Sequence, residues 1–166
     1  TKRSILINMG AELHLVDPKP FSDPGNYQRV SERLSKEIEK ERGIKTFWAG
    51  QFENTANYKF HKLSTGSEIF DQTQGLIDGF TCSVGTGGTI TGVSEALKER
   101  NRKIKIACTD SQGSSMYNYF TRGNLEKKGD ESITEGIGQS RVTKNLENCK
   151  VDMSFFVNDQ ECMEIL

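Results

Sequence analysis

One stretch, Phe80–Thr89 (FTCSVGTGGT), limits what this chain can fold into more than any other. Its first half is typical of a buried strand and its second half is a glycine-rich turn. The turn opens a helix whose apolar positions are Ile90, Val93 and Leu97. A strand, a glycine turn and a helix place several backbone N–H groups at the positive end of the helix, which is a phosphate site. The sequence therefore predicts that a phosphate-bearing small molecule binds at this turn.

The glycine turn differs from the two commonest phosphate-binding motifs. A P-loop needs Gly-Lys-Ser/Thr, which is absent. A dinucleotide-binding fingerprint needs Gly-x-Gly-x-x-Gly, whereas Gly85 and Gly87 are followed by Ile90. A glycine cluster before a helix is also compatible with a plain helix cap, so the turn alone leaves both interpretations open.

Strand and helix patterns alternate along the whole chain. Alternating or continuous apolar residues predict strands at 12–16, 46–49, 78–84, 104–108 and 151–157. Helical periodicity predicts helices at 1–9, 27–42, 56–63, 67–73, 88–100 and 116–121 and from 159 onward. This order predicts an α/β fold of three layers, with a mostly parallel sheet and helices on both faces. In such sheets ligands bind at the carboxyl ends of the strands, where the glycine turn lies.

Composition and charge exclude several classes of function. The chain has 166 residues, enough for one ordinary domain, and a net charge of −1 with acids and bases interspersed. This pattern favours neither nucleic acid nor an anionic membrane as a partner, and no apolar run is long enough to span a bilayer. Cys82 and Cys108, both in predicted strands, are expected to be buried reduced thiols rather than parts of a disulfide framework. We expect an intracellular protein, cytoplasmic or alternatively mitochondrial.

Four stretches, in order along the chain, resemble a known family. Ser83–Val93 closely resembles the phosphate loop of cysteine synthases and cystathionine β-synthases, which are pyridoxal-phosphate enzymes of the tryptophan-synthase-β fold (fold type II). Gln51–Phe70 is similar to the family's Gln-Phe-x-Asn-Pro-Ala-Asn…His…Thr-Gly-Pro-Glu-Ile-Trp run, with Thr55, Ser67 and Phe70 as departures. Two further stretches, Gly10–Leu13 and Glu135–Gly138, resemble a strand entry and a second glycine loop of the active site.

The resemblance implies part of a two-domain fold. Residues 1–54 would be the C-terminal part of the small, substrate domain, and residues 55–166 would be part of the large domain that binds the phosphate of pyridoxal phosphate. The family's Schiff-base lysine lies in a Ser-x-Lys-type motif, and no lysine of this chain has that context. We therefore expect a central fragment of a longer enzyme, with no catalytic residue of its own, inactive in isolation, and a homodimer as the full-length protein.

The resemblance also implies which residues form the site. The phosphate of pyridoxal 5′-phosphate, the one expected cofactor, would be held by the five residues Gly85, Thr86, Gly87, Gly88 and Thr89. Gly136, Ile137 and Gly138 would lie beside the cofactor and the substrate, because glycine permits close backbone approach. Gln51 would help to position the substrate. No metal ligand set is expected.

The reaction that the resemblance implies is β-replacement, which makes L-cysteine from O-acetylserine or serine and sulfide. The absent lysine would remove the α-proton, and the pyridine ring of the cofactor would absorb the carbanion charge. Asp110, Gly113 and Ser114 resemble the Asp-Pro-x-Gly-Ser stretch of cystathionine β-synthases. Cystathionine β-synthase-like or serine/threonine dehydratase activity is therefore one alternative, and a non-catalytic ligand-binding or interaction module is another.

Two further polar residues have both a structural and a functional interpretation. His61 lies in a predicted helix, where we expect a hydrogen-bonded structural histidine rather than a catalyst. Asp110 lies at the end of a predicted strand. It is either a group near the cofactor or an acid that caps a helix or is solvated.

Overall fold

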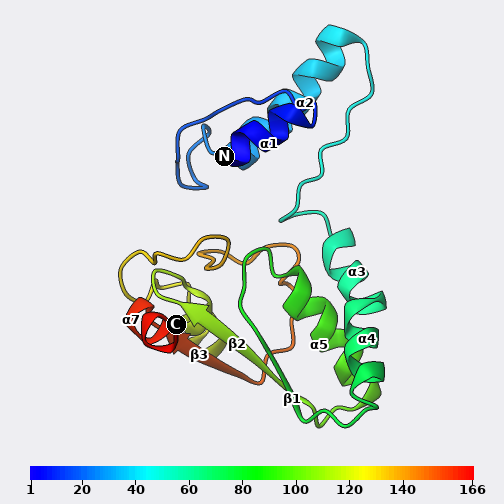
Figure 1. The fold of residues 1–166 in the computed structure, drawn as a ribbon, viewed down its shortest axis with the longest axis vertical. Coiled ribbons are helices and arrows are strands. Elements are labelled where there is room, and N and C mark those ends of the chain that lie inside the picture. Colours follow the sequence, from blue (N-terminus) through cyan, green and yellow to red (C-terminus); the bar gives the residue numbers. More distant parts are fainter. The chain divides into compact units, whose positions relative to one another are not determined.

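The computed structural model describes residues 1–166, which form two compact units, Thr1–Gly50 and Gln51–Leu166 (Figure 1). The assignment of the two units to the small and large domains of a two-domain fold stays a prediction. The predicted division between residues 54 and 55 also stays a prediction. None of the helices has the length and apolar content that crossing a membrane requires.

The first unit contains two helices, α1 (Lys2–Asn8) and α2 (Tyr27–Arg42). The side chain of Asn26 accepts a hydrogen bond from the Gln28 N–H at 3.0 Å, so Asn26 is the N-cap of α2. Gly43 ends α2 in the left-handed conformation (φ 65°), which glycine adopts without a steric penalty. The prediction of a helix over 27–42 is confirmed at both ends.

The two strands predicted in this unit, 12–16 and 46–49, are wrong, because both segments are irregular. Their side chains instead contact α2: the Arg42 guanidinium donates to both carboxylate oxygens of Glu12 at 3.0 Å, and Trp48 Nε1 donates to a serine hydroxyl of that helix. An alternating sequence pattern specifies which face is apolar, but a strand also needs a neighbour for its backbone hydrogen bonds. Neither segment has such a neighbour.

The second unit carries the sheet and the remaining helices. Along the chain these are α3 (Ala56–Leu63), α4 (Thr65–Gln72), β1 (Gly79–Cys82), α5 (Gly88–Arg100), β2 (Lys105–Ser111), α6 (Met116–Arg122), β3 (Met153–Val157) and α7 (Asp159–Ile165). The three strands are parallel, in the order β1-β2-β3. The α/β class and the parallel sheet are thus confirmed. The predicted strand at 78–84 is shortened to β1, because its last residues already belong to the glycine turn.

The apolar core lies between the sheet and α5. Ile106 and Cys108 of β2 are fully buried, together with Val93 and Leu97 of α5. These two α5 positions are among the apolar residues that the helical period predicted to face the core. Burying a side chain of this size contributes about 1.5–3 kcal/mol relative to an exposed one. This packing fixes α5, and therefore the glycine turn at its start, against the sheet.

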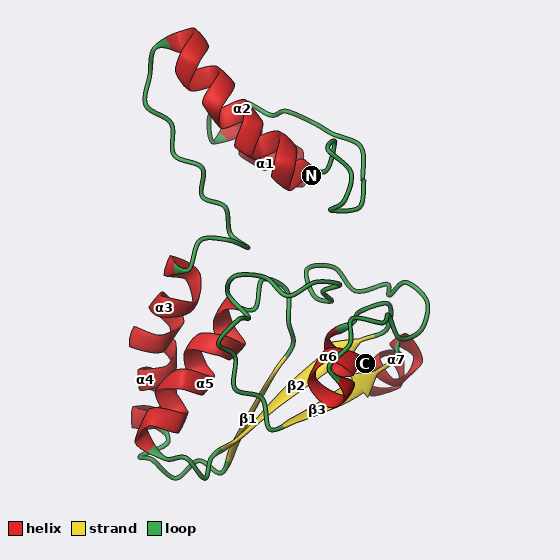
Figure 2. Cartoon of the chain, turned by 180° about the vertical axis from the view of Figure 1, so that it is seen from behind, coloured by secondary structure: helices red, strands yellow, loops and turns green.

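Helices α3, α4 and α5 pack together beside β1 (Figure 2). Gly92, in the middle of α5, lies directly against the backbone of α3. A Cβ atom built on Gly92 would collide with the Tyr58 carbonyl oxygen and would lie 2.6 Å from the Lys62 nitrogen. At Gly66 of α4 the corresponding atom would lie 2.5 Å from Ala96 Cβ. The three helices can approach this closely only because neither position carries a side chain.

We expect the substitution Gly92→Ala to destabilise the protein. Alanine improves helix propensity by about 1 kcal/mol, but the atoms it would meet are backbone atoms that cannot move away cheaply. Overpacking of this kind costs about 1–3 kcal/mol, and after the gain in helix propensity we expect a net loss of about 1–2 kcal/mol. Urea unfolding of the purified protein measures the change. The control, Glu68→Ala at an exposed position of α4, should stay within about 0.5 kcal/mol, and an unchanged midpoint for Gly92→Ala would contradict the packing account.

The cysteines are free thiols in the structure. Cys82 in β1 and Cys108 in β2 are neighbours across the parallel strand pair, and Cys108 is fully buried as predicted. Burial raises the pKa of the Cys108 thiol to about 12 and that of the Cys149 thiol to about 11.

These pKa values predict inert thiols at Cys108 and Cys149. Since the thiolate is the reactive form, alkylation of both residues near pH 8 should be at least about a hundredfold slower in the native protein than in urea. Mass spectrometry of peptides after timed iodoacetamide treatment checks this. Equal rates in the native and unfolded protein would show that the two thiols are accessible.

Candidate functional site

The candidate site lies at the carboxyl edge of the parallel sheet. Ser83–Gly87 follows β1, and Gln112–Ser115 follows β2. Because the strands are parallel, both loops emerge at the same edge, where ligands bind in open α/β sheets. The prediction that the glycine turn lies at this edge is confirmed.

The second glycine loop packs directly against the first. The Gly138 N–H donates to the Val84 carbonyl oxygen at 2.8 Å, and Gln139 Nε2 donates to the Gly85 carbonyl oxygen at 3.1 Å. A Cβ atom on Gly85 would lie 2.5 Å from the Gly136 carbonyl oxygen, so the contact requires glycine at position 85. The structure thus brings together two loops that are separated by about fifty residues of sequence.

The start of α5 forms a cradle of backbone groups. Its N-cap, Gly87, is in the left-handed conformation (φ 87°) and has no side chain with which to cap the helix. A Cβ atom on Gly87 would collide with the side chain of Leu146, and one on Gly88 would collide with the side-chain amide of Asn57. The first N–H groups of an α-helix have no partner within the helix, and together with the helix dipole they favour an anion.

Both threonines of the loop are held by polar side chains of α3. Thr86 Oγ1 accepts from Asn57 Nδ2 at 2.9 Å and from the Gly88 N–H at 3.3 Å. Thr89 Oγ1 lies 3.3 Å from His61 Nε2, and the other ring nitrogen of His61 lies 2.9 Å from Thr65 Oγ1. His61 is therefore a hydrogen-bonded histidine, as predicted, and its partner is a residue of the glycine loop.

Sequence reasoning missed two buried residues of a later loop. Thr143 Oγ1 donates to the Thr86 carbonyl oxygen at 2.7 Å. Asn145 Nδ2 donates to the carbonyl oxygens of Gln51 and Phe52, both at 3.0 Å, and Asn145 Oδ1 accepts from the Tyr58 N–H. Both side chains are fully buried. No local pattern distinguishes single polar residues in a loop, so only their burial reveals them.

The remaining predicted site residues to be placed are Gln51, Ile137 and Gly138. The backbone of Gln51 is fixed by Asn145, but Gln51 is exposed, and its role in positioning a substrate stays a prediction. Ile137 and Gly138 line a polar cavity of about 300 Å³, together with Ser111–Ser114 and Ser140. Their place beside a cofactor also stays a prediction.

Asp110 is inside β2 and is almost completely buried. Its Oδ2 accepts from the Tyr117 N–H at 2.7 Å, so the carboxylate caps the start of α6. Burial raises the pKa of this carboxyl, and hydrogen bonds from the Ser114 hydroxyl and from backbone N–H groups partly oppose the shift. Of the interpretations that the sequence left open, the structure supports the helix cap.

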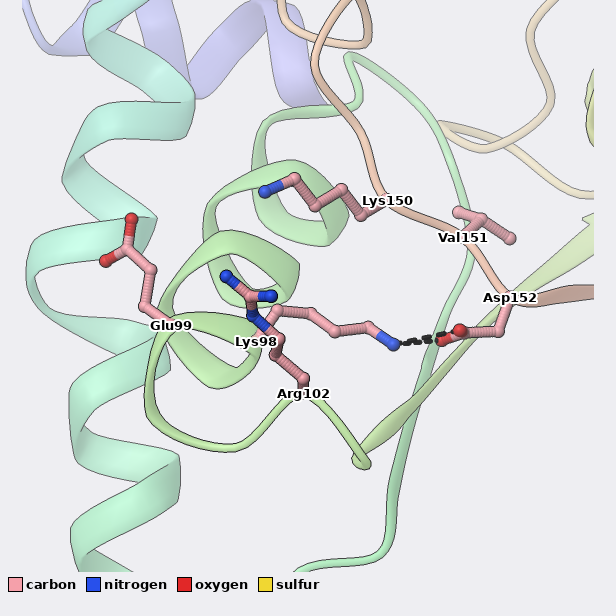
Figure 3. Close-up of a pocket in the computed structure, with 6 residues that line it drawn as sticks. All are labelled: Lys98, Glu99, Arg102, Lys150, Val151 and Asp152. Carbon is pink, nitrogen blue, oxygen red and sulfur yellow. Dashed lines mark hydrogen bonds and ion pairs between the residues drawn. The ribbon is translucent and has the colours of Figure 1, made fainter.

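A different cavity, of about 510 Å³, lies at the far end of α5 (Figure 3). Lys98 crosses this region to the Asp152 carboxylate, with Nζ–O distances of 2.7 and 2.8 Å. Arg102 and Lys150 also line this cavity, but their charged groups point away from Asp152 (Figure 3). None of the predicted site residues lines this cavity, so the glycine-loop edge remains the candidate site.

Comparison with known proteins gives the family. The sequence matches the family described as "Pyridoxal-phosphate dependent enzyme" over residues 1–166, and the chain belongs to this family. It is 38% identical to "Cysteine synthase 1" of Neurospora crassa over 170 residues, which cover 99% of this chain and 44% of the relative. It is 37% identical to "Cysteine synthase 1" of Emericella nidulans over 169 residues, again 99% of this chain and 44% of the relative. The chain thus spans less than half the length of these relatives.

The residues at the glycine loop fit the phosphate of pyridoxal 5′-phosphate. The N-cap residue of α5 is a glycine without a side chain, and the loop has glycine where a Cβ atom would collide with neighbouring side chains. Two threonine hydroxyls and several backbone N–H groups supply donors, which is what a phosphate dianion needs. The observed loop therefore agrees with the family's cofactor.

The contact between the two glycine loops predicts the effect of Gly85→Ala. The added Cβ would push the second loop away from the first, and we expect the affinity for pyridoxal 5′-phosphate to fall at least about tenfold, as misplacement of a binding group does. A fluorescence titration of the purified apoprotein measures this. Gly25→Ala is the matched control, because a Cβ atom there would meet the flexible side chain of Lys19 and not backbone. Equal affinities for both variants would show that the close contact is not needed.

Proposed function

We propose that this chain is part of a pyridoxal-phosphate-dependent cysteine synthase, which makes L-cysteine from O-acetylserine or serine and sulfide by β-replacement. The proposal is supported by two observations. Relatives named cysteine synthase match nearly the whole chain, and the two glycine loops that the resemblance assigns to the active site lie in contact. Relatives with the same name in several organisms favour this activity over the dehydratase and binding-module alternatives.

In this proposal the chain binds and orients the cofactor. The N–H groups at Gly85–Thr89 and the start of the α5 dipole hold the phosphate. Gly136–Gly138 form the neighbouring wall, where the two glycines, which have no side chain, leave room for the cofactor and the amino-acid substrate. Gln51 borders the same site and positions the substrate. When bound, pyridoxal phosphate supplies an electron sink for the charge that develops at the substrate α-carbon.

The contacts of the loop explain how it would keep its shape around an anion. At the first end of the loop, Gln139 bonds to Gly85, and Asn57 and Thr143 bond to Thr86. At the other end His61 bonds to Thr89, so that both ends are held. A cradle fixed before binding loses little conformational freedom when the phosphate arrives. Because the phosphate is held in a fixed cradle, the rest of the bound small molecule is oriented as well.

The activity is tested with the purified full-length protein and pyridoxal 5′-phosphate. We expect cysteine to form from O-acetylserine or serine with sulfide, and we expect activity to be lost when the cofactor is removed by dialysis against a carbonyl-trapping amine. Parallel assays with serine and homocysteine, and with serine or threonine alone, report on the cystathionine β-synthase-like and dehydratase alternatives. If no cysteine forms from O-acetylserine or from serine, the proposal is overturned.

We also propose that the full-length protein is an intracellular homodimer, as expected from the resemblance. The cytoplasm is the proposed compartment, with the mitochondrion as the alternative. The substrate is a small molecule in either case, in agreement with the family.

A further inference from the structure

The hydrogen bonds of Asn57 define which way the Thr86 hydroxyl points. Asn57 Nδ2 lies 3.1 Å from the Gln51 carbonyl oxygen, which can only accept, and 2.9 Å from Thr86 Oγ1. The two amide hydrogens therefore serve these two oxygens. Thr86 Oγ1 also accepts from the Gly88 N–H, so both of its lone pairs are used. Its own hydrogen remains available as a donor.

His61 controls the Thr89 hydroxyl through its tautomer. A neutral imidazole donates from one nitrogen and accepts at the other. If Nδ1 carries the hydrogen, Nε2 must accept the hydrogen of Thr89, and the hydroxyl is no longer a donor. If Nε2 carries it, His61 donates to Thr89, and the Thr65 hydroxyl donates to Nδ1. Only the second arrangement leaves the Thr89 hydrogen free.

We propose that the Asn57–His61 face of α3 directs both threonine hydroxyls of the glycine loop toward a bound phosphate monoester, with His61 held as the Nε2–H tautomer. Asn57 and His61 are four residues apart and therefore lie on one side of the helix. This inference rests on the proposed function, because the phosphate monoester is that of the cofactor. Asn57 and His61 are positioning residues, since each acts through a threonine.

The packing of α3 on α5 makes the arrangement geometrically specific. Gly88 and Gly92 of α5 are also four residues apart, and they face Asn57 and His61 respectively. A Cβ atom on Gly88 would collide with the Asn57 amide, and one on Gly92 would lie 2.7 Å from His61 Cβ. Two polar side chains of α3 are thus seated over two glycines of α5, each within reach of a threonine hydroxyl.

A double-mutant cycle on the full-length protein tests the proposal. The affinities for pyridoxal 5′-phosphate and for pyridoxal, which lacks the phosphate, are measured by fluorescence titration for His61→Leu, Thr89→Val and the double variant. Each single change should weaken pyridoxal 5′-phosphate about tenfold, as loss of a hydrogen bond to a charged group does. The double variant should be no weaker than Thr89→Val alone, because His61 acts through that hydroxyl. The affinity for pyridoxal should stay within about twofold in all three variants, because pyridoxal has no phosphate for the Thr89 hydroxyl to bind.

Lys59→Leu is the matched control, because Lys59 is an exposed residue of α3 between the two positioning residues. Its affinities for both compounds should equal those of the wild type. Additive effects of His61→Leu and Thr89→Val, or an equal loss for pyridoxal and its phosphate, would overturn the proposal.

Nitrogen NMR of the wild-type holoprotein gives a readout that a merely structural histidine would not produce. With labelled histidine, the His61 signals are assigned by their loss in a second variant, His61→Gln, whose side chain is polar. We expect a protonated Nε2 and an unprotonated Nδ1 when pyridoxal 5′-phosphate is bound. An Nδ1–H tautomer in the holoprotein would overturn the proposal even if the leucine variant failed to fold.

The two proposals fail separately. A protein with coupled His61 and Thr89 that makes no cysteine would overturn the proposed activity and leave the inference standing. A protein that makes cysteine, but whose affinity for pyridoxal 5′-phosphate is unchanged by His61→Leu, would overturn only the inference.

Discussion

The close approach of α3 to α5 at Gly88 and Gly92 is the constraint on which the site depends. It places Asn57 and His61 against the two threonines of the glycine loop. An alanine at either glycine would separate the helices and so remove those contacts. The glycines of this loop therefore serve two purposes: some admit an anion to the backbone, and others admit a neighbouring helix.

Much of the local structure could be predicted from the sequence. The helix over 88–100 was predicted at both ends, because a glycine turn and an apolar stripe define it independently. The same holds for α2, which has an asparagine cap and a terminal glycine. The strands at 12–16 and 46–49 failed for a physical reason: their existence depends on a partner strand, which local sequence does not specify.

The candidate site likewise contains residues that a local sequence pattern predicts and residues that it does not. The glycine loop and its edge of the sheet followed from a contiguous motif and from the rule for parallel strands. Thr143 and Asn145 did not, since hydrogen bonds to residues more than fifty positions away leave no trace in a local pattern. Asp110 lies between these cases. Its place at the end of a strand was predicted, although β2 extends past it to Ser111. Its role as a helix cap became clear only from its burial and from its bond to the start of α6.

The bonds of Asn145 also affect the order of events during folding. This residue connects Gln51, Phe52 and Tyr58, which lie almost ninety or more positions earlier in the chain, and Leu146 closes over Gly87. Contacts of such high sequence separation form slowly, because the entropy of closing a long loop is lost before the contact is gained. During synthesis on the ribosome, the glycine turn is made long before Leu146, which packs against it. The chain therefore acquires a complete phosphate cradle only after Asn145 and Leu146, which lie late in the second unit, have been synthesised.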